Sequence, residues 1–211
     1  MATLYFLGGE HVWKRDSKEI NARAFLDAGG KPAVLVFPWA RSSFDKSYFQ
    51  RARIFKYFKS LGASTVDFAE YSDPSSELVE KVEFSDLIYL TGGLTSVLLE
   101  RIRNKNVDTL LREYGKVIVG RSAGALVLCN RCIITRNRER PATVAISGIR
   151  LVDFSIKVHY NPSKDNQLKL LSKEEKIYAI PEGSALVYAG GSLASIGNVY
   201  LFQNGEKTRA D

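Results

Sequence analysis

Short apolar runs alternate with amphipathic segments up to about residue 140. The runs predict β-strands at residues 4–7, 33–37, 65–68, 87–91 and 116–119. The intervening segments are predicted to be helical. Residues 43–61 place apolar side chains near helical spacing before a capping Gly62, and Thr95 is expected to cap a later helix. Strands of this kind separated by helices predict an α/β fold, a mainly parallel doubly wound sheet with helices on both faces.

The pattern changes in the last third of the chain. Residues 154–160, 176–180, 185–188 and 199–202 are predicted to be strands, with one helix around 164–171. This favours a C-terminal β-meander or hairpin added to the sheet. Because no linker, repeat or low-complexity tract interrupts the chain, we predict a single domain over residues 1–211.

The composition is that of a globular domain. The chain has 211 residues, of which 45% are hydrophobic and 25% charged, enough for a core without disulfides. It has neither the roughly 18 to 20 uninterrupted apolar residues of a membrane span nor the basic lead and long apolar run of a signal peptide. A cytoplasmic protein without a membrane partner is therefore expected.

The formal net charge of +7 raises the question of an anionic partner. The basic residues are spread over the chain. Their densest run, which consists of Arg131, Arg136, Arg138 and Arg140, lacks the interleaved aromatic residues of a base-stacking surface. The favoured interpretation is that the basic residues lie on solvent-exposed faces, so no nucleic-acid partner is expected. An acidic substrate remains an open alternative.

The two cysteines form the pattern Cys129-Asn130-Arg131-Cys132. Such a pair can be a redox site or half of a zinc site. A zinc site needs further ligands, and His11 and His159 are the only histidines. Buried core cysteines are the favoured interpretation, and no metal or other cofactor is expected.

The strand at 116–119 leads directly into Gly120-Arg121-Ser122-Ala123-Gly124 and then into an apolar helix start. In a G-x-S-x-G elbow the serine adopts a strained conformation that only small flanking residues allow, and its hydroxyl projects at the carboxyl end of the sheet. The alternative is a glycine turn that only packs a helix on a strand. The context on both sides favours Ser122 as a nucleophile.

A serine nucleophile needs a base that accepts its hydroxyl proton, and a histidine base needs a carboxylate that orients its ring. His159 ends an apolar strand, where catalytic groups of open α/β sheets gather, whereas His11 lies among charged residues and is expected in an exposed loop. Among the carboxylates, Glu182 also follows a strand, in Ile180-Pro181-Glu182-Gly183. The other candidates are Glu139, Asp153, Asp165, Glu174 and Glu175.

A glycine pair follows the strand at 87–91, in Thr91-Gly92-Gly93-Leu94-Thr95. Glycines there can bring a backbone N–H to an oxyanion. A phosphate-binding loop is the competing interpretation, but the G-x-x-x-x-G-K-[ST] spacing is absent.

Taken together, the glycine loop, the elbow, Val158-His159-Tyr160-Asn161-Pro162 and the turn at Glu182 resemble the dipeptidase E family of α-aspartyl dipeptidases, which are related to cyanophycinases. The resemblance covers nearly the whole chain. It implies a fold similar to the class I glutamine amidotransferases and a serine peptidase that hydrolyses short peptides without a cofactor. It also implies a triad of Ser122, His159 and Glu182.

The same resemblance implies oxyanion-hole N–H groups at Gly93 and Ala123. Gly92, Arg121 and Tyr160 adjoin these positions and are candidate substrate contacts. The family recognises the aspartate of its substrate with an arginine in the sequence segment between the histidine and the glutamate. In this chain that segment, residues 160–181, contains only lysines as basic residues. Arg121, or one of Arg136, Arg138 and Arg140, is a hypothetical carboxylate contact; the alternative is a surface arginine.

Three other functions remain open at this point. The same triad would serve a cyanophycinase-like or isopeptide hydrolase, or an esterase. A catalytically silent member would bind a ligand or partner in the same cleft. The sequence also leaves a homodimer open.

Overall fold

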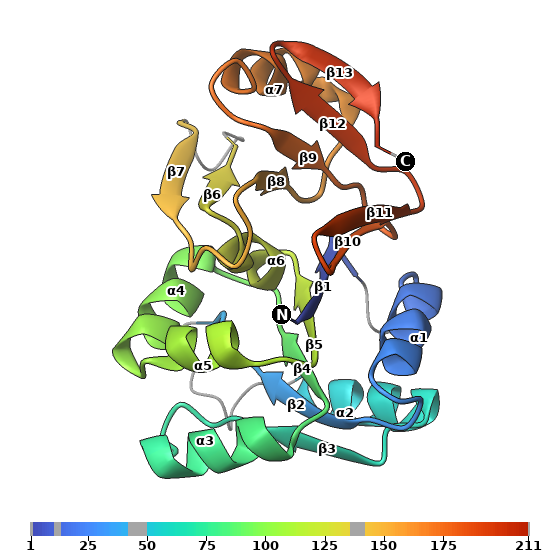
Figure 1. Cartoon of the computed structure of the whole chain (residues 1–211), viewed down its shortest axis with the longest axis vertical. Coiled ribbons are helices and arrows are strands. Elements are labelled where there is room, and N and C mark those ends of the chain that lie inside the picture. Colours follow the sequence, from blue (N-terminus) through green and yellow to red (C-terminus); the bar gives the residue numbers. More distant parts are fainter. Residues whose placement is uncertain (1, 11–13, 42–49, 136–141, 211) are drawn as a thin grey trace.

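Two β-sheets make up the framework of the protein. The computed structural model describes residues 2–10, 14–41, 50–135 and 142–210. In the view of Figure 1 a seven-stranded sheet lies in the lower half and a six-stranded sheet in the upper half. Among the described residues no helix is long and apolar enough to cross a membrane.

The larger sheet has the strand order β11-β10-β1-β5-β4-β2-β3. Its strands are β1 (Thr3–Leu7), β2 (Ala33–Phe37), β3 (Thr65–Phe68), β4 (Leu87–Leu90), β5 (Val117–Arg121), β10 (Ala185–Ala189) and β11 (Ser192–Ile196). Strands β1 to β5 pair in parallel, and the β10–β11 hairpin extends the sheet antiparallel to β1. The structure thus confirms the parallel sheet that the apolar runs predict.

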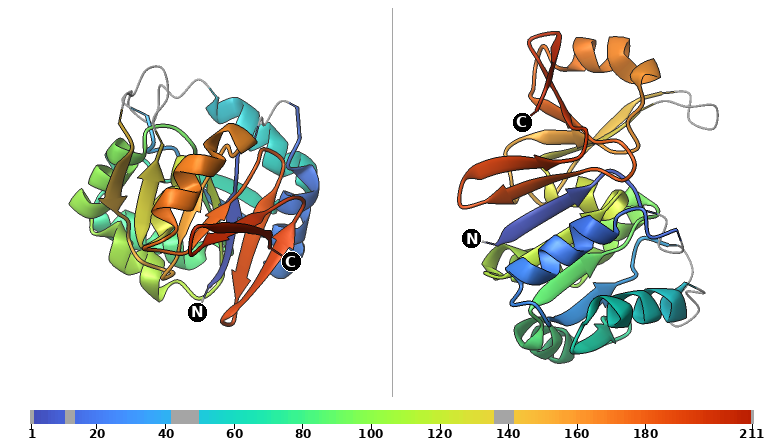
Figure 2. Two further views of the ribbon diagram at one scale, coloured as in Figure 1. Left: turned by 90° about the horizontal axis from the view of Figure 1, so that it is seen from above. Right: turned by 90° about the vertical axis from the view of Figure 1, so that its right-hand side faces the viewer.

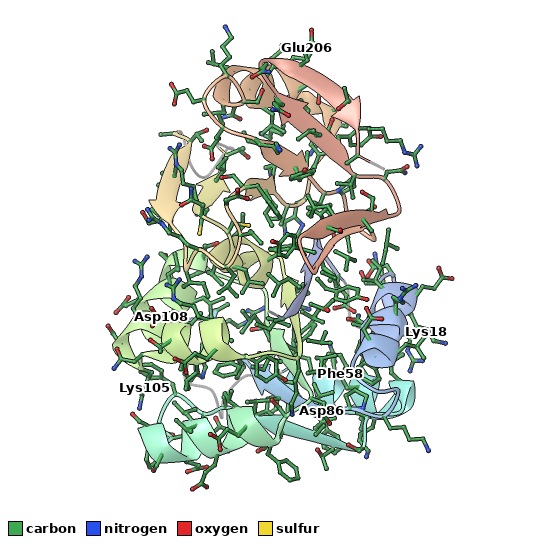
Figure 3. All side chains as sticks on the ribbon, in the orientation of Figure 1. Lys18, Phe58, Asp86, Lys105, Asp108 and Glu206 are labelled. Carbon is green, nitrogen blue, oxygen red and sulfur yellow. The ribbon has the colours of Figure 1, made fainter. Side chains whose placement is uncertain are left out.

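Helices cover both faces of this sheet (Figure 2). They are α1 (Lys18–Asp27), α2 (Arg51–Leu61), α3 (Ser75–Phe84), α4 (Thr95–Asn104), α5 (Val107–Glu113) and α6 (Ala123–Leu128). The side chains of α1 and α2 share one core with the sheet, and those of the other four share the second core. In Figure 3 Phe58 of α2 is labelled in the interior, where it is 1% exposed, whereas Lys18 lies on the exposed side of α1.

The smaller sheet has the order β13-β12-β9-β8-β6-β7. Its strands are β6 (Arg131–Ile134), β7 (Val144–Ser147), β8 (Ser155–Lys157), β9 (Ile177–Ala179), β12 (Tyr200–Gln203) and β13 (Glu206–Arg209). A 3₁₀ turn at Pro162–Lys164 and helix α7 (Asp165–Leu171) connect β8 to β9. The hydrophobic pattern predicts strands in this region but not a second sheet, because the alternation of side chains does not say which distant strand is the partner.

Helix α6 lies between the two sheets. All six of its residues are buried, and it contacts β1, β4 and β5 of one sheet and β6 and β8 of the other. Small and aliphatic residues on every side suit a helix with no solvent face. The residue that precedes this helix, Ser122, therefore lies where the two sheets meet.

Two details differ from the sequence-based expectation. Thr95 is the first residue of α4 rather than its cap; Leu94 occupies the N-cap position, and no side-chain cap hydrogen bond forms there. Strand β5 continues through Gly120 and Arg121, because these residues still pair with Phe6 and Leu7 of β1.

The expected helix over 43–61 is described from Arg51 onward, and residues 42–49 lie outside the described part.

Candidate active site

Ser122 occupies the sharp turn between β5 and α6. Its backbone has φ 52° and ψ −108°, a conformation that costs a non-glycine residue about 1–3 kcal/mol. A Cβ on Gly120 would lie 2.6 Å from the backbone of Gly124 and Ala125, and a Cβ on Gly124 would lie 2.2 Å from the carbonyl oxygen of Leu90. Both flanking glycines are therefore required, as the elbow pattern predicts.

His159 lies just beyond β8 and reaches Ser122 across the gap between the sheets. Its Nε2 is 2.7 Å from Ser122 Oγ. The residue has φ 49°, and its backbone N–H donates to the carbonyl of Gly8 at 2.8 Å. That bond ties the histidine to the end of β1, although β1 and β8 belong to different sheets.

Glu182 follows β9 and stands behind the imidazole. Its Oε1 is 2.5 Å from His159 Nδ1. Two of the other candidate carboxylates have different partners. Asp165 accepts hydrogen bonds from Tyr160 and Lys207, and Glu175 accepts them from Arg131 and Ser155.

The turn Gly8–Gly9 after β1 is a functional element that the sequence reasoning missed. A Cβ on Gly9 would lie 1.9 Å from Glu182 Oε2, and one on Gly8 would lie 2.1 Å from the carbonyl oxygen of Pro181. The glycines therefore let the segment that carries Glu182 pack directly on the end of β1. The signal was present in the sequence as a glycine pair that ends a strand.

The glycine loop after β4 faces Ser122 from the other side. Gly93 has φ 152°, and a Cβ there would lie 2.2 Å from the carbonyl oxygen of Ala40. The same carbonyl accepts the N–H of Leu94 at 2.6 Å. The N–H of Ala123 is the first of α6 and has no acceptor within the helix. Both N–H groups thus belong to backbone that closely packed neighbours hold in place.

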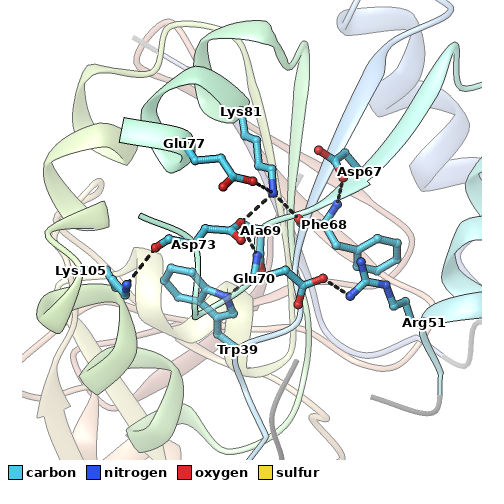
Figure 4. Close-up of polar contacts among 10 residues, drawn as sticks. All are labelled: Trp39, Arg51, Asp67, Phe68, Ala69, Glu70, Asp73, Glu77, Lys81 and Lys105. Atoms are coloured by element: carbon cyan, nitrogen blue, oxygen red, sulfur yellow. Dashed lines mark hydrogen bonds and ion pairs between the residues drawn. The ribbon is translucent and has the colours of Figure 1, made fainter. Parts of the chain in front are cut away.

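A polar cluster around Trp39 anchors the segment that leads to Ala40 (Figure 4). Trp39 donates its indole N–H to the carbonyl of Ala69 at 2.8 Å. The turn after Ala69 is held in place by an ion pair between Arg51 and Glu70 and by the contact of Lys81 Nζ with Asp73 Oδ2 at 2.7 Å. Side chains of α2 and α3 thereby support the glycine loop.

A pocket of about 370 Å³ opens on one side of Ser122, with Gly93 and His159 also in its wall. Lys157 and Lys164 line it as well. Burial, together with the charge of Lys164, lowers the pKa of Lys157 to about 8. Lys157 was not recognised from the sequence, because a lysine in an alternating strand is usually on the solvent face.

A second pocket, of about 300 Å³, shares Gly93, Ser122 and His159 with the first. Gly92 and Arg121 line it. Arg121 is 7% exposed, so the alternative of a surface arginine is wrong.

Other predicted residues lie elsewhere. Tyr160 is 6% exposed, packs on Tyr200 and Phe202, and is in the wall of neither pocket, so its proposed role as a substrate contact is corrected. Its side chain belongs to a small hydrophobic core that also contains Leu168 of α7. Cys129 and Cys132 are buried free cysteines, as expected.

Five positions named in the sequence analysis fall outside the described residues: His11, Arg136, Arg138, Glu139 and Arg140. Within the described ranges no cluster of three or more His, Cys, Asp or Glu side chains could hold a metal ion.

Comparison with known proteins gives relatives along most of the chain. The sequence model of peptidase family S51 matches residues 4–196. The uncharacterized peptidase Lmo0363 of Listeria monocytogenes is 30% identical over 147 residues, which cover 64% of this chain and 72% of that protein. Peptidase E of Haemophilus influenzae is 28% identical over 136 residues, 57% of this chain and 62% of that protein.

Solved structures show the same fold. A Listeria monocytogenes EGD-e protein named as a candidate peptidase E superposes with a TM-score of 0.72 at 27% identity, over 93% of this chain and 98% of that one. A peptidase from an acI-B1 Actinobacterium gives 0.75 at 20% identity, over 100% and 94%. These likenesses confirm the predicted α/β fold of the class I glutamine amidotransferase type. The chain therefore belongs to peptidase family S51 and is a serine peptidase.

Proposed function

We propose that Ser122, His159 and Glu182 are the catalytic triad of a peptidase that hydrolyses short peptides, in the manner of dipeptidase E. The observation that carries the proposal is the chain of two short contacts, 2.7 Å from Ser122 Oγ to His159 Nε2 and 2.5 Å from His159 Nδ1 to Glu182 Oε1. Contacts of this length are within reach for proton transfer from the hydroxyl to the imidazole.

In the proposed reaction Ser122 Oγ attacks the carbonyl carbon of the scissile peptide bond while His159 Nε2 accepts the hydroxyl proton. Glu182 keeps the Nδ1 proton in place and stabilises the imidazolium. Collapse of the tetrahedral intermediate breaks the C–N bond, and His159 returns the proton to the leaving amine. Water then attacks the acyl-enzyme, with the same histidine as base.

The N–H groups of Gly93 and Ala123 are proposed to bind the oxyanion of both tetrahedral intermediates. Their positions support this role, because both flank Ser122, and because neighbouring backbone holds the first of them in a conformation suited to glycine. Donors already oriented toward the developing charge need little rearrangement during the reaction.

A library of dipeptides and tripeptides, incubated with wild type and with Ser122→Ala, tests the proposal. We expect hydrolysis by the wild type and a loss of kcat of about 10⁴-fold or more in the variant. A fluorophosphonate should label Ser122 in the wild type, and His159→Ala should abolish the labelling. Equal turnover by Ser122→Ala, or labelling at another residue, would contradict the triad.

A further inference from the structure

The elbow arginine occupies an unusual place for a charged side chain. Arg121 directly precedes Ser122, is 7% exposed, and borders the second pocket, which also contains Ser122 and His159. A Cβ built on Gly92 would come within 3.2 Å of Arg121 Nε, so the guanidinium group passes directly over that glycine. A guanidinium group is therefore held within the active-site wall, next to the nucleophile.

A buried carboxyl group lies in the wall of the same pocket. Glu10 is 8% exposed and lines the same pocket. Its Oε1 accepts a hydrogen bond from Asn21 at 2.7 Å and its Oε2 accepts one from Tyr89 at 2.5 Å. Burial raises the pKa of Glu10, and the hydrogen bond from Tyr89 and the charge of Arg121 act in the opposite direction.

The network around Glu10 extends into both helices on that face of the sheet. Asn21 of α1 also donates to the hydroxyl of Tyr57 of α2 at 2.8 Å. Asn21 and Tyr89 are both buried, with 1% and 0% of their surface exposed. A buried polar network whose members are all hydrogen-bonded holds its charged member rigidly. The carboxyl group of Glu10 is therefore held in a fixed position within electrostatic reach of Arg121.

The pocket nevertheless has an excess of positive charge. Among the described residues in its wall, Arg41 and Arg121 are cationic and Glu10 is the acidic one. The remaining lining residues are Gln50, Gly92, Gly93, Ser122 and His159. Guanidinium groups bind carboxylates through paired N–H donors, and such bonds are strong where water is excluded.

We infer that Arg121, with Arg41, binds a carboxylate of the peptide substrate next to the scissile bond, and that Glu10 is the positioning residue that orients Arg121. The inference rests on the proposed function and deepens it by naming a chemical requirement of the substrate. The carboxylate has two sources in a short peptide, the free C-terminus and an acidic side chain. Both present the same group to the guanidinium.

The test compares pairs of substrates that differ in one charge. The first pair is the best dipeptide from the library and its C-terminal amide. The second pair carries Glu or Gln at one position of the same peptide. In Arg121→Gln we expect kcat/KM for the charged member of one pair to fall about 10- to 100-fold, mainly through KM, while the neutral member changes by less than about threefold. Discrimination is the ratio of kcat/KM for the charged member of a pair to that for the neutral member. The pair whose ratio falls in Arg121→Gln identifies the source of the carboxylate.

Glu10→Gln tests the positioning role. It keeps a side chain of the same shape and should reduce the same discrimination by a smaller factor, again through KM rather than kcat. Arg23→Gln is the matched control, because Arg23 is an arginine of α1 whose side chain is 67% exposed. This control should leave both ratios unchanged.

Removing Arg121 alone leaves Glu10 without its opposite charge and can lower stability. The double variant Glu10→Gln/Arg121→Gln removes both charges and should fold, with the same loss of discrimination as Arg121→Gln. If the folded variants keep the wild-type ratios of kcat/KM for both substrate pairs, the inference is overturned. That result would leave the proposed triad unaffected. Absence of any Ser122-dependent hydrolysis in wild type would instead refute the proposed function and, with it, this inference.

Discussion

Lys157 is a buried lysine whose positive charge lowers the stability of the folded state. It is 8% exposed, and its Nζ donates a hydrogen bond to the carbonyl of the next residue, Val158. In the part of the chain that the structure describes, no carboxylate forms an ion pair with it. Burying a charge in this way is unfavourable, so the native state should bind its proton less tightly than the unfolded state does.

We therefore predict that Lys157→Met stabilises the protein at pH 7. The pKa of Lys157 is lowered from 10.5 to about 8 in the folded state, so below pH 8 both states are protonated and the folded state carries the full penalty, about 3 kcal/mol at most. Between pH 8 and 10.5 the folded lysine releases its proton first, and wild-type stability should rise relative to the variant. Urea unfolding at pH 7 and pH 10 measures this difference.

Lys18→Met serves as the control for that comparison, because Lys18 is exposed on α1. It should change the free energy of unfolding by no more than about 0.5 kcal/mol at either pH. A difference between wild type and Lys157→Met that stays constant from pH 7 to pH 10 would contradict the assigned burial penalty.

Among the structural elements, the end of β1 positions the proposed triad, although it supplies none of the three side chains. The carbonyl of Gly8 receives the N–H of His159, and the N–H of Gly8 donates to the carbonyl of Ser184 at 3.1 Å. Gly9 lies against the carboxylate of Glu182. One turn therefore sets the distance between the strand that precedes His159 and the strand that precedes Glu182.

Gly9→Ala should reduce catalysis without unfolding the protein. The added methyl group would lie 1.9 Å from Glu182 Oε2, so the carboxylate must move away from His159. With the triad as proposed, a displacement of about 1 Å lowers kcat about 100-fold. Steady-state kinetics and the rate of fluorophosphonate labelling both measure this loss.

The matched substitution is Gly115→Ala, at a glycine where a Cβ meets nothing within 4 Å. Its kcat should equal that of the wild type. Wild-type kinetics in Gly9→Ala would show that Glu182 does not need its present position, and would count against its role behind His159.

At the scale of the whole molecule, the two sheets share one core. Phe154, which precedes β8, packs on Phe6 of the larger sheet with ring centroids 5.6 Å apart, and on Tyr178 of the smaller sheet at 5.0 Å. It also lies 6.3 Å from Tyr188 of β10. A core that crosses the boundary between the sheets is expected to make them unfold together.

Phe154→Ala should lower the free energy of unfolding by about 3–5 kcal/mol, because it opens a cavity between the sheets. Wild type and variant should both unfold in a single transition, by circular dichroism and by tryptophan fluorescence alike. Phe84→Ala is the control, since Phe84 is 76% exposed and its loss should cost less than about 0.5 kcal/mol. Two separate transitions would contradict the prediction of a single domain.

The local pattern predicted a large part of this picture. The five parallel strands follow from their apolar runs, and the turn at Ser122 follows from the small residues that flank it, because both depend on neighbours in the sequence. His159 and Glu182 were found as polar residues at strand ends. The complete set of Ser122, His159 and Glu182 came from the resemblance, since residues 37 and 60 positions away from Ser122 along the chain are brought near it only by the fold.

Strand periodicity and the turn at Ser122 are short-range properties, so the amino-acid pattern alone was enough to predict them. Tertiary structure decided which groups lose contact with water and which charges face each other. It placed Lys157 and Arg121 in the walls of two pockets, brought Glu10 into the same pocket wall as Arg121, and packed Gly9 against Glu182. The reason is physical: burial and electrostatic pairing depend on distances between residues that are far apart in the chain, and no periodic pattern encodes those distances.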